Sequence, residues 1–166
     1  LEPLEPRIVL AADLGFPAAN DDLYLRLDGS NYELTAADSD NSPALATIAK
    51  ADVTNGELSI DGNQLRDSTL RLSSTVLGEG LTLTFNGVGT GDTLVVNSDN
   101  DFSLLEVDAN GAITRTIQVG SDSTNLASPL TGFDQVRLIG GQSDNTLTVG
   151  GWSGDWIFDG VAGSNK

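Results

Sequence analysis

The sequence predicts an all-β protein, and three observations carry that prediction. Apolar and polar residues alternate over short runs, turn dipeptides that contain glycine separate the runs, and helical periodicity is nearly absent. Alternation places every second side chain on one face of an extended strand. We therefore expect a degenerate β-solenoid of the parallel β-helix kind with an extended N-terminal arm, and a β-sandwich is the alternative.

The first part of the chain is expected to precede the repeats. Residues 1–19 should form the extended arm, because three prolines remove backbone donors and disfavour helix in the residues before them. These prolines are Pro3, Pro6 and Pro17. Residues 20–57 should form a mixed β-region that caps the repeats, and residues 42–50 within it are the best candidate for a short helix.

The rest of the chain, residues 58–166, is expected to form the solenoid-like repeats. Its alternating runs predict a core stacked in ladders: Leu58, Ile60, Leu70, Leu72, Leu83, Phe85, Leu94, Val96, Val136, Leu138, Leu147 and Val149. Asp-Gly or Asn-Gly dipeptides end the runs at Gly62, Gly87 and Gly160. A Gly-Gly dipeptide, Gly140-Gly141, ends another run. We expect these glycines to supply the positive φ of tight turns.

Internal repetition favours the solenoid over the sandwich. Four segments share a frame in which a strand ends at a glycine turn and a small polar loop follows: 61–70, 86–94, 140–147 and 159–166. Their turn glycines are separated by 25, 53 and 20 residues. If the long gap is two coils, with the Asn110-Gly111 turn near its midpoint, the period is roughly 20–27 residues. The last frame stops where a strand should start, so we expect the natural polypeptide to continue.

Composition excludes many functions. The chain has no Cys, His or Met, which removes disulfides, thiolate or imidazole metal sites and Ser-His-Asp triads. Its 24 acidic and 8 basic residues give a net charge of −16, which disfavours nucleic acid and anionic membranes as partners. One carboxylate pair, Asp155 and Asp159 beside Trp156, could suit glycoside hydrolysis, but acids are so abundant that some must neighbour a tryptophan. We expect no enzyme.

Two candidate binding sites remain. Asn97, Asp99, Asp101 and Asp108 approach the spacing of a calcium loop, although Phe102 stands where that loop needs glycine. The competing interpretation is ordinary solvated turn residues.

Trp152 and Trp156 lie four residues apart, so in one alternating strand they would share a face and could stack on a sugar. Burial against a neighbouring coil is the competing interpretation. Ca²⁺ is thus the single cofactor considered, and surface polysaccharide is a candidate partner.

Two segments resemble one kind of protein. Residues 4–13, Leu-Glu-Pro-Arg-Ile-Val-Leu-Ala-Ala-Asp, resemble the LEPR-XLL motif near the N-termini of very large bacterial surface or secreted proteins, with Val9 in place of the usual Leu. Residues 130–166 resemble the β-strand repeats of such adhesin-like proteins. The resemblance implies an extracellular or cell-surface location and no catalytic residues.

The expected function is a non-enzymatic structural or adhesive segment of a large secreted or cell-surface protein. Such a segment could associate with other segments or copies of the same protein through β edges or coil ends. A glycan- or calcium-binding β module is the alternative.

Overall fold

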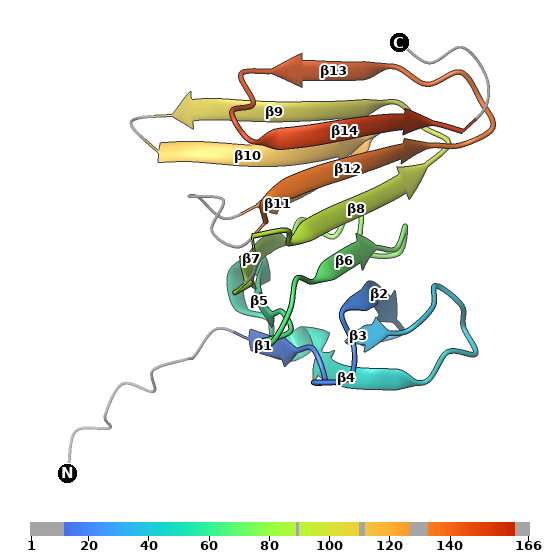
Figure 1. Cartoon of the computed structure of the whole chain (residues 1–166), viewed down its shortest axis with the longest axis vertical. Helices are drawn as coiled ribbons and strands as arrows, with labels where there is room; N and C mark the ends of the chain where they lie inside the picture. Colours follow the sequence, from blue (N-terminus) through green and yellow to red (C-terminus); the bar gives the residue numbers. More distant parts are fainter. Residues whose placement is uncertain (1–11, 89, 110–111, 127–132, 162–166) are drawn as a thin grey trace.

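The computed structural model describes residues 12–88, 90–109, 112–126 and 133–161, and it confirms the all-β class. The described strands form two seven-stranded sheets (Figure 1). Sheet A contains, in spatial order, β1 (Ala12–Gly15), β5 (Glu57–Asp61), β7 (Thr82–Asn86), β11 (Asp122–Leu126), β10 (Ala112–Val119), β9 (Phe102–Ala109) and β13 (Leu147–Gly150). Sheet B contains β14 (Asp155–Gly160), β12 (Gln135–Gly140), β8 (Thr93–Ser98), β6 (Thr69–Leu72), β2 (Asp22–Asp28), β3 (Asn31–Thr35) and β4 (Ala44–Ala49).

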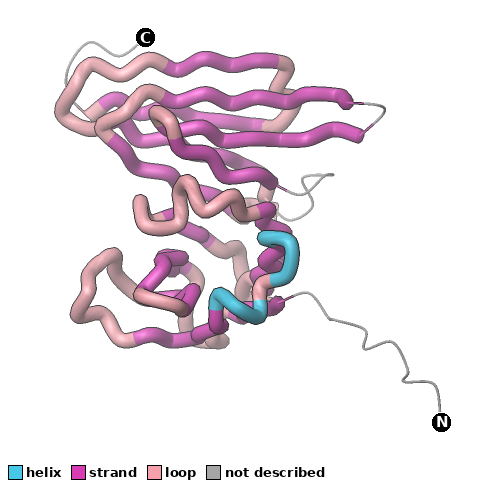
Figure 2. Tube along the Cα trace, turned by 180° about the vertical axis from the view of Figure 1, so that it is seen from behind, coloured by secondary structure: helices cyan, strands magenta, loops and turns pink. Residues whose placement is uncertain are grey.

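The described residues contain two 3-10 helices, Lys50–Asp52 and Thr54–Gly56, which are cyan in Figure 2. They contain no α-helix. The helix predicted for residues 42–50 is wrong, because Ala44–Ala49 forms β4 and pairs antiparallel with β3. Pairing with a neighbouring strand outweighs the weak local helix propensity of this stretch. No helix in the described ranges is long and apolar enough to cross a membrane.

The chain alternates between the two sheets, and this alternation makes most strand pairs parallel. From β5 onward it visits sheet A, sheet B, sheet A and sheet B in β5, β6, β7 and β8, and each strand pairs parallel with the previous strand of its own sheet. Two sets of strands depart from this pattern: β2–β3–β4 and β9–β10–β11 are antiparallel meanders.

The predicted core ladders are present. In sheet B, Leu70, Leu94 and Val136 occupy one register position, as do Leu72, Val96 and Leu138. In sheet A, Leu58 pairs with Leu83 and Ile60 pairs with Phe85. These ten side chains are at most 4% exposed. Rings from both sheets meet in the same core, where Phe102 of β9 packs edge-to-face on Phe158 of β14 at 5.8 Å between centroids.

Two predicted core residues differ from the rest. Val149 is 39% exposed, and Leu147 is only partly buried against the core. Both lie on β13, which is the last strand of sheet A and pairs only with β9 among the described strands. The prediction for Val149 is wrong because no described strand stacks beyond β13 to cover its side chain.

At the opposite end of the molecule, the last strands of the two sheets lie close to each other. β3 and β4 extend sheet B beyond β2, and β4 also approaches β1 of sheet A (Figure 1). Leu14 of β1 is 2% exposed and Phe16 is 9% exposed. The predicted arm therefore includes residues of the folded body from Ala12 onward, while its residues 1–11 lie outside the described part of the chain.

The four repeat frames combine two kinds of turn. The first two frames begin where strands of sheet A end, at the paired residues Asp61 and Asn86. The last two begin where strands of sheet B end, at the paired residues Gly140 and Gly160. The gap of 53 residues between frames is therefore not two coils. A single passage from β8 to β12 spans it, because the β9–β10–β11 meander is inserted there. The Asn110-Gly111 turn lies outside the described residues; the strands that flank it, β9 and β10, are antiparallel neighbours.

Several turn glycines serve a different purpose from the predicted one. Gly62 and Gly141 do not have positive φ. At Gly62 a Cβ would lie 2.7 Å from Cζ of Phe85, and at Gly141 it would collide with the carboxylate of Asp99. Glycine is needed at these turns because a neighbouring strand or turn comes too close for a side chain to fit. Left-handed backbone geometry is not the reason.

Candidate functional site

Several aspartates in the turns form hydrogen bonds between neighbouring levels of the structure. By a level we mean one strand of each sheet together with the turn that joins them. Asp67 Oδ1 accepts the Thr90 N–H (3.1 Å), and Asp92 Oδ1 accepts the Ser68 N–H (2.6 Å). Asp134 Oδ2 accepts the N–H of Asp92 itself (2.9 Å). Each carboxylate satisfies a backbone donor that belongs to a neighbouring level, and we call these interactions turn staples.

Two of the four predicted calcium residues form turn staples of the same kind. Asp99 Oδ1 accepts the Gln142 N–H, and Asp101 Oδ1 accepts the Thr146 N–H, both at 2.7 Å. Asn97 lies on β8 and lines a pocket on the outer face of sheet B, while the side chain of Asp108 is outside the described part. In the described ranges no three acidic side chains gather into a metal-binding group. Calcium binding at this site stays a prediction.

The two tryptophans do not share a surface. Trp152 precedes β14, is 9% exposed and belongs to the core cluster. Trp156 lies on β14, in register with the buried Val136, yet it is 42% exposed because β14 is the last strand of sheet B. The expectation of one aromatic face is wrong, since residue 152 is not part of the strand that holds residue 156.

The carboxylate pair considered for glycoside hydrolysis also lies on β14. Asp155 and Asp159 are four residues apart on the edge strand, and Asp159 Oδ2 accepts a hydrogen bond from Arg137 Nε at 2.6 Å. Neither residue lines the pocket described below.

Glu106 joins three segments near the end of sheet A. Its carboxylate accepts hydrogen bonds from Arg115 Nε of β10 (3.1 Å) and from the Ser153 N–H (2.9 Å). The hydrogen bond from the Ser153 backbone, followed by those from the Ser153 hydroxyl and Arg115, lowers the pKa of Glu106 against the opposing effect of desolvation. This cluster fixes the turn before β14 and is structural in character.

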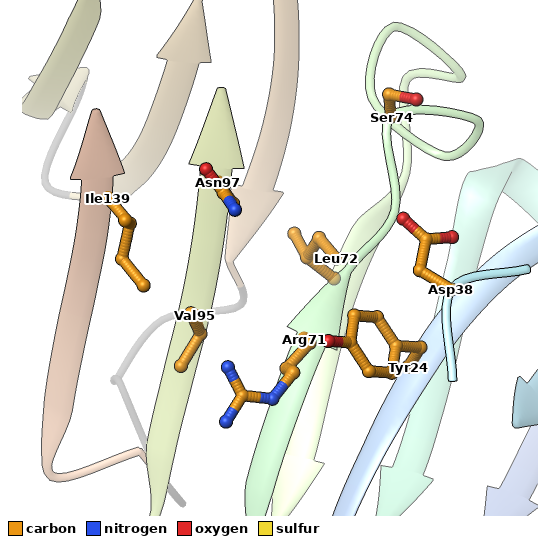
Figure 3. A pocket seen from close by; sticks show the side chains of 8 residues that line it. All are labelled: Tyr24, Asp38, Arg71, Leu72, Ser74, Val95, Asn97 and Ile139. Carbon is orange, nitrogen blue, oxygen red and sulfur yellow. The ribbon is translucent and has the colours of Figure 1, made fainter. Parts of the chain in front are cut away.

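A pocket of about 270 Å³ lies on the outer face of sheet B. Figure 3 shows its lining: Tyr24 of β2, Asp38 of the β3–β4 loop, Arg71 and Leu72 of β6, Ser74 of the following loop, Val95 and Asn97 of β8, and Ile139 of β12. Arg71 binds Asp22 through two nitrogens (2.6 and 2.8 Å) and lies 5.7 Å from the Tyr24 ring centroid. The hydrogen bond to Asp22 raises the pKa of Arg71, so the guanidinium is charged.

Sequence reasoning found only Asn97 among these residues. The pocket exists because β6 ends at Leu72, whereas its neighbours β2 and β8 continue to Asp28 and Ser98. A short run between Thr69 and Leu72 is visible in the sequence, but which strands lie beside it is not.

Comparisons with known proteins give no family for the chain. No protein-family model, curated protein or solved structure matches it. Of the LEPR-like motif, the structure describes only Ala12 and Asp13, which begin β1.

Proposed function

We propose that the chain is a non-enzymatic structural segment of a large exported or cell-surface protein, built as a two-sheet β-solenoid. The observation that carries this proposal is the register: Leu23, Leu70, Leu94, Val136 and Trp156 occupy one position on five successive parallel strands of sheet B. Each level thus repeats the same inward position, as expected when every coil buries its apolar face against its neighbours.

Turn staples support the same proposal. They join residues that are 23 to 45 positions apart in sequence, such as Thr90 with Asp67 and Thr146 with Asp101. A stack held by ladders inside and by carboxylates at its corners resists separation of its levels, which suits a spacer or adhesive stalk. The resemblance of residues 4–13 to the LEPR-XLL motif supports an extracellular or cell-surface location.

Duplicating one coil tests the architecture. Leu94 follows its ladder partner Leu70 by 24 residues, so inserting a second copy of residues 70–93 should add one strand to each sheet. We expect a folded protein with stronger β circular dichroism and a melting temperature no lower than that of the parent, because each level contacts only its neighbours.

The matched control duplicates only residues 82–93, which hold β7 and the following turn. This half-coil would send the next strand to the wrong sheet, and we expect loss of cooperative unfolding. Unfolding or aggregation of the full-coil variant would favour a closed sandwich over the solenoid.

We further propose that copies of the chain associate through the end formed by β13 and β14. Each of these strands has one partner among the described strands, and Val149 and Trp156 are exposed there although their register positions face inward. Unpaired strand edges with apolar side chains are templates for β pairing. Two copies that pair through this end, each presenting the same strands to the other, would form a dimer.

Light scattering after size-exclusion chromatography measures this association. We expect a concentration-dependent dimer that Trp156→Lys reduces to a monomer, while Leu65→Lys, at an 80% exposed turn position away from this end, leaves it intact. A monomer at every concentration up to about 100 μM would refute self-association at this end. Antibodies that fail to label intact, unpermeabilised cells carrying the protein would refute the surface location.

A further inference from the structure

The pocket on the outer face of sheet B has a structural origin that makes it a fixed feature. β6 ends at Leu72, so the last residues of β2 and β8 have no strand between them. The chain leaves β6 through Ser73, whose N–H donates to the Leu25 carbonyl (3.0 Å), and the Thr75 hydroxyl accepts the Leu27 N–H (2.9 Å). These bonds hold the loop with Ser74 at the rim.

The opposite rim is held by a buried arginine. Arg26 is 6% exposed, and its guanidinium donates to the Glu33 carboxylate (2.9 and 3.1 Å). It also donates to the carbonyl oxygens of Ser39 and Ser42, which follow Asp38 in the β3–β4 loop. A rim fixed from both sides reduces the entropy lost when a ligand binds.

The polar groups that line the pocket are available to a ligand. Among the described residues, the side chains of Tyr24, Asp38, Ser74 and Asn97 make no hydrogen bond, and Arg71 uses Nε and Nη2 for Asp22 while Nη1 has no partner. They supply both donors and acceptors. Val95, which is 5% exposed, and Ile139 add an apolar surface among them (Figure 3).

Charge excludes two ligand classes. A metal ion would have a single carboxylate, Asp38, and would lie near the guanidinium of Arg71. An anion would find that guanidinium already paired with Asp22, in a chain of net charge −16. A neutral ligand whose hydroxyls both donate and accept, and whose C–H groups can contact an apolar surface, fits the lining.

We propose that this pocket binds one neutral pyranose sugar ring. The volume of about 270 Å³ lies just below the range of pockets for drug-sized molecules, which suits a single ring rather than an extended chain. Asn97, Ser74 and Asp38 contact ring hydroxyls, and Val95 and Ile139 contact the C–H face. The proposal is independent of the scaffold role, because a solenoid without sugar affinity would remain a structural segment.

Titration of the ¹⁵N-labelled chain with methyl α-glucoside, methyl α-mannoside, methyl β-galactoside and N-acetylglucosamine tests this. We expect at least one sugar to cause saturable shifts of the Ser74, Val95 and Asn97 amides, with a Kd of about 1–10 mM. Asn97→Ala should weaken that binding about tenfold through the loss of hydrogen bonds, whereas Thr148→Ala on β13 of sheet A should leave it unchanged.

Three results would overturn the proposal. The first is the absence of saturable shifts with all four sugars at about 50 mM. The second is equal affinity of the Asn97→Ala variant, provided that its unchanged spectrum shows it to be folded. The third is saturation of the same amides by CaCl₂ alone in competition with the sugar, which would make the pocket a cation site.

Discussion

Asp92 is the turn staple whose removal should cost most stability. Its side chain is buried, with the residue 1% exposed, and Oδ1 accepts the Ser68 N–H at 2.6 Å. Its backbone contacts with Asp134 and Gln135 involve only main-chain groups of residue 92, so they survive replacement of the side chain. Asp92→Ala therefore isolates the effect of the carboxylate.

The hydrogen bond from Ser68 accounts for two contributions to the loss. A hydrogen bond to a charged acceptor contributes about 1.5–3 kcal/mol, and a buried N–H left without a partner costs about 1–3 kcal/mol. The two values overlap and are not added in full, because both describe the loss of the same hydrogen bond. We expect Asp92→Ala to lower the free energy of unfolding by about 2–4 kcal/mol, a large part of the roughly 5–15 kcal/mol typical of a domain. Asp92→Asn keeps an acceptor oxygen and should lose only about 1 kcal/mol.

Urea denaturation followed by circular dichroism measures the loss, and hydrogen exchange of the Ser68 amide shows its location. Asp13→Ala is the control, because Asp13 is an exposed acid on β1. If Asp92→Ala costs no more than Asp13→Ala, or if exchange at Ser68 is unchanged, the hydrogen bond from Ser68 to Asp92 does not contribute to stability.

Three further outcomes test the core, the ion pairs and the loop. Leu94→Ala should lower the free energy of unfolding, measured by urea denaturation, by about 2–5 kcal/mol, because Leu94 is fully buried within its ladder. Leu65→Ala at an exposed turn should lower it by under about 0.5 kcal/mol, and similar losses for the two variants would contradict the register. The pKa of Glu106 is lowered in the folded state, so its stabilising effect should be present above its unfolded-state pKa and lost as pH falls through the folded-state value. Glu106→Gln should therefore reduce the decrease of unfolding free energy at acidic pH. An unchanged decrease would argue against a stabilising effect of the ionised Glu106. If Asp99 and Asp101 act only as staples, melting should be the same in CaCl₂ and in EDTA, and a higher melting temperature in calcium would restore the metal site.

The strands and their inward faces could be predicted because the alternation of side chains is a local property. Thr69-Leu70 and Thr93-Leu94 each begin a strand of sheet B, and the paired leucines face the core as their spacing indicates. Register then follows from burying the same face on successive levels. Alternation and the inward face of each strand depend on only a few neighbouring residues at a time.

The assignment of strands to sheets could not be predicted from the same information. Thr146-Leu147 looks like Thr93-Leu94 in sequence, yet Leu147 begins β13 in sheet A and pairs with Phe102. Turns from sheet A to sheet B and turns in the opposite direction both use glycine, asparagine and aspartate, because each must close tightly and satisfy exposed backbone groups. The local sequence therefore does not tell which way a turn leads.

The roles of turn aspartates depend on partners far away in the chain. Asp99 accepts the N–H of Gln142, 43 residues later, and packs against Gly141. Solvated turn, calcium ligand and staple all favour the same residue type at such a position. The hydrogen bonds of Asp99 and Asp101 to distant backbone groups therefore could not be predicted from the spacing of these residues.

The pocket shows how a surface site can vary while the scaffold stays the same. Its outline depends on the length of one strand, β6, and on the loops that carry Asp38 and Ser74, whereas the ladder through Leu70 and Leu94 depends only on inward positions. Because side chains on the two faces of a strand alternate, changes at the outward Arg71 and Asn97 leave the core untouched. The residues that line the pocket can therefore change without loss of the inward contacts between neighbouring strands.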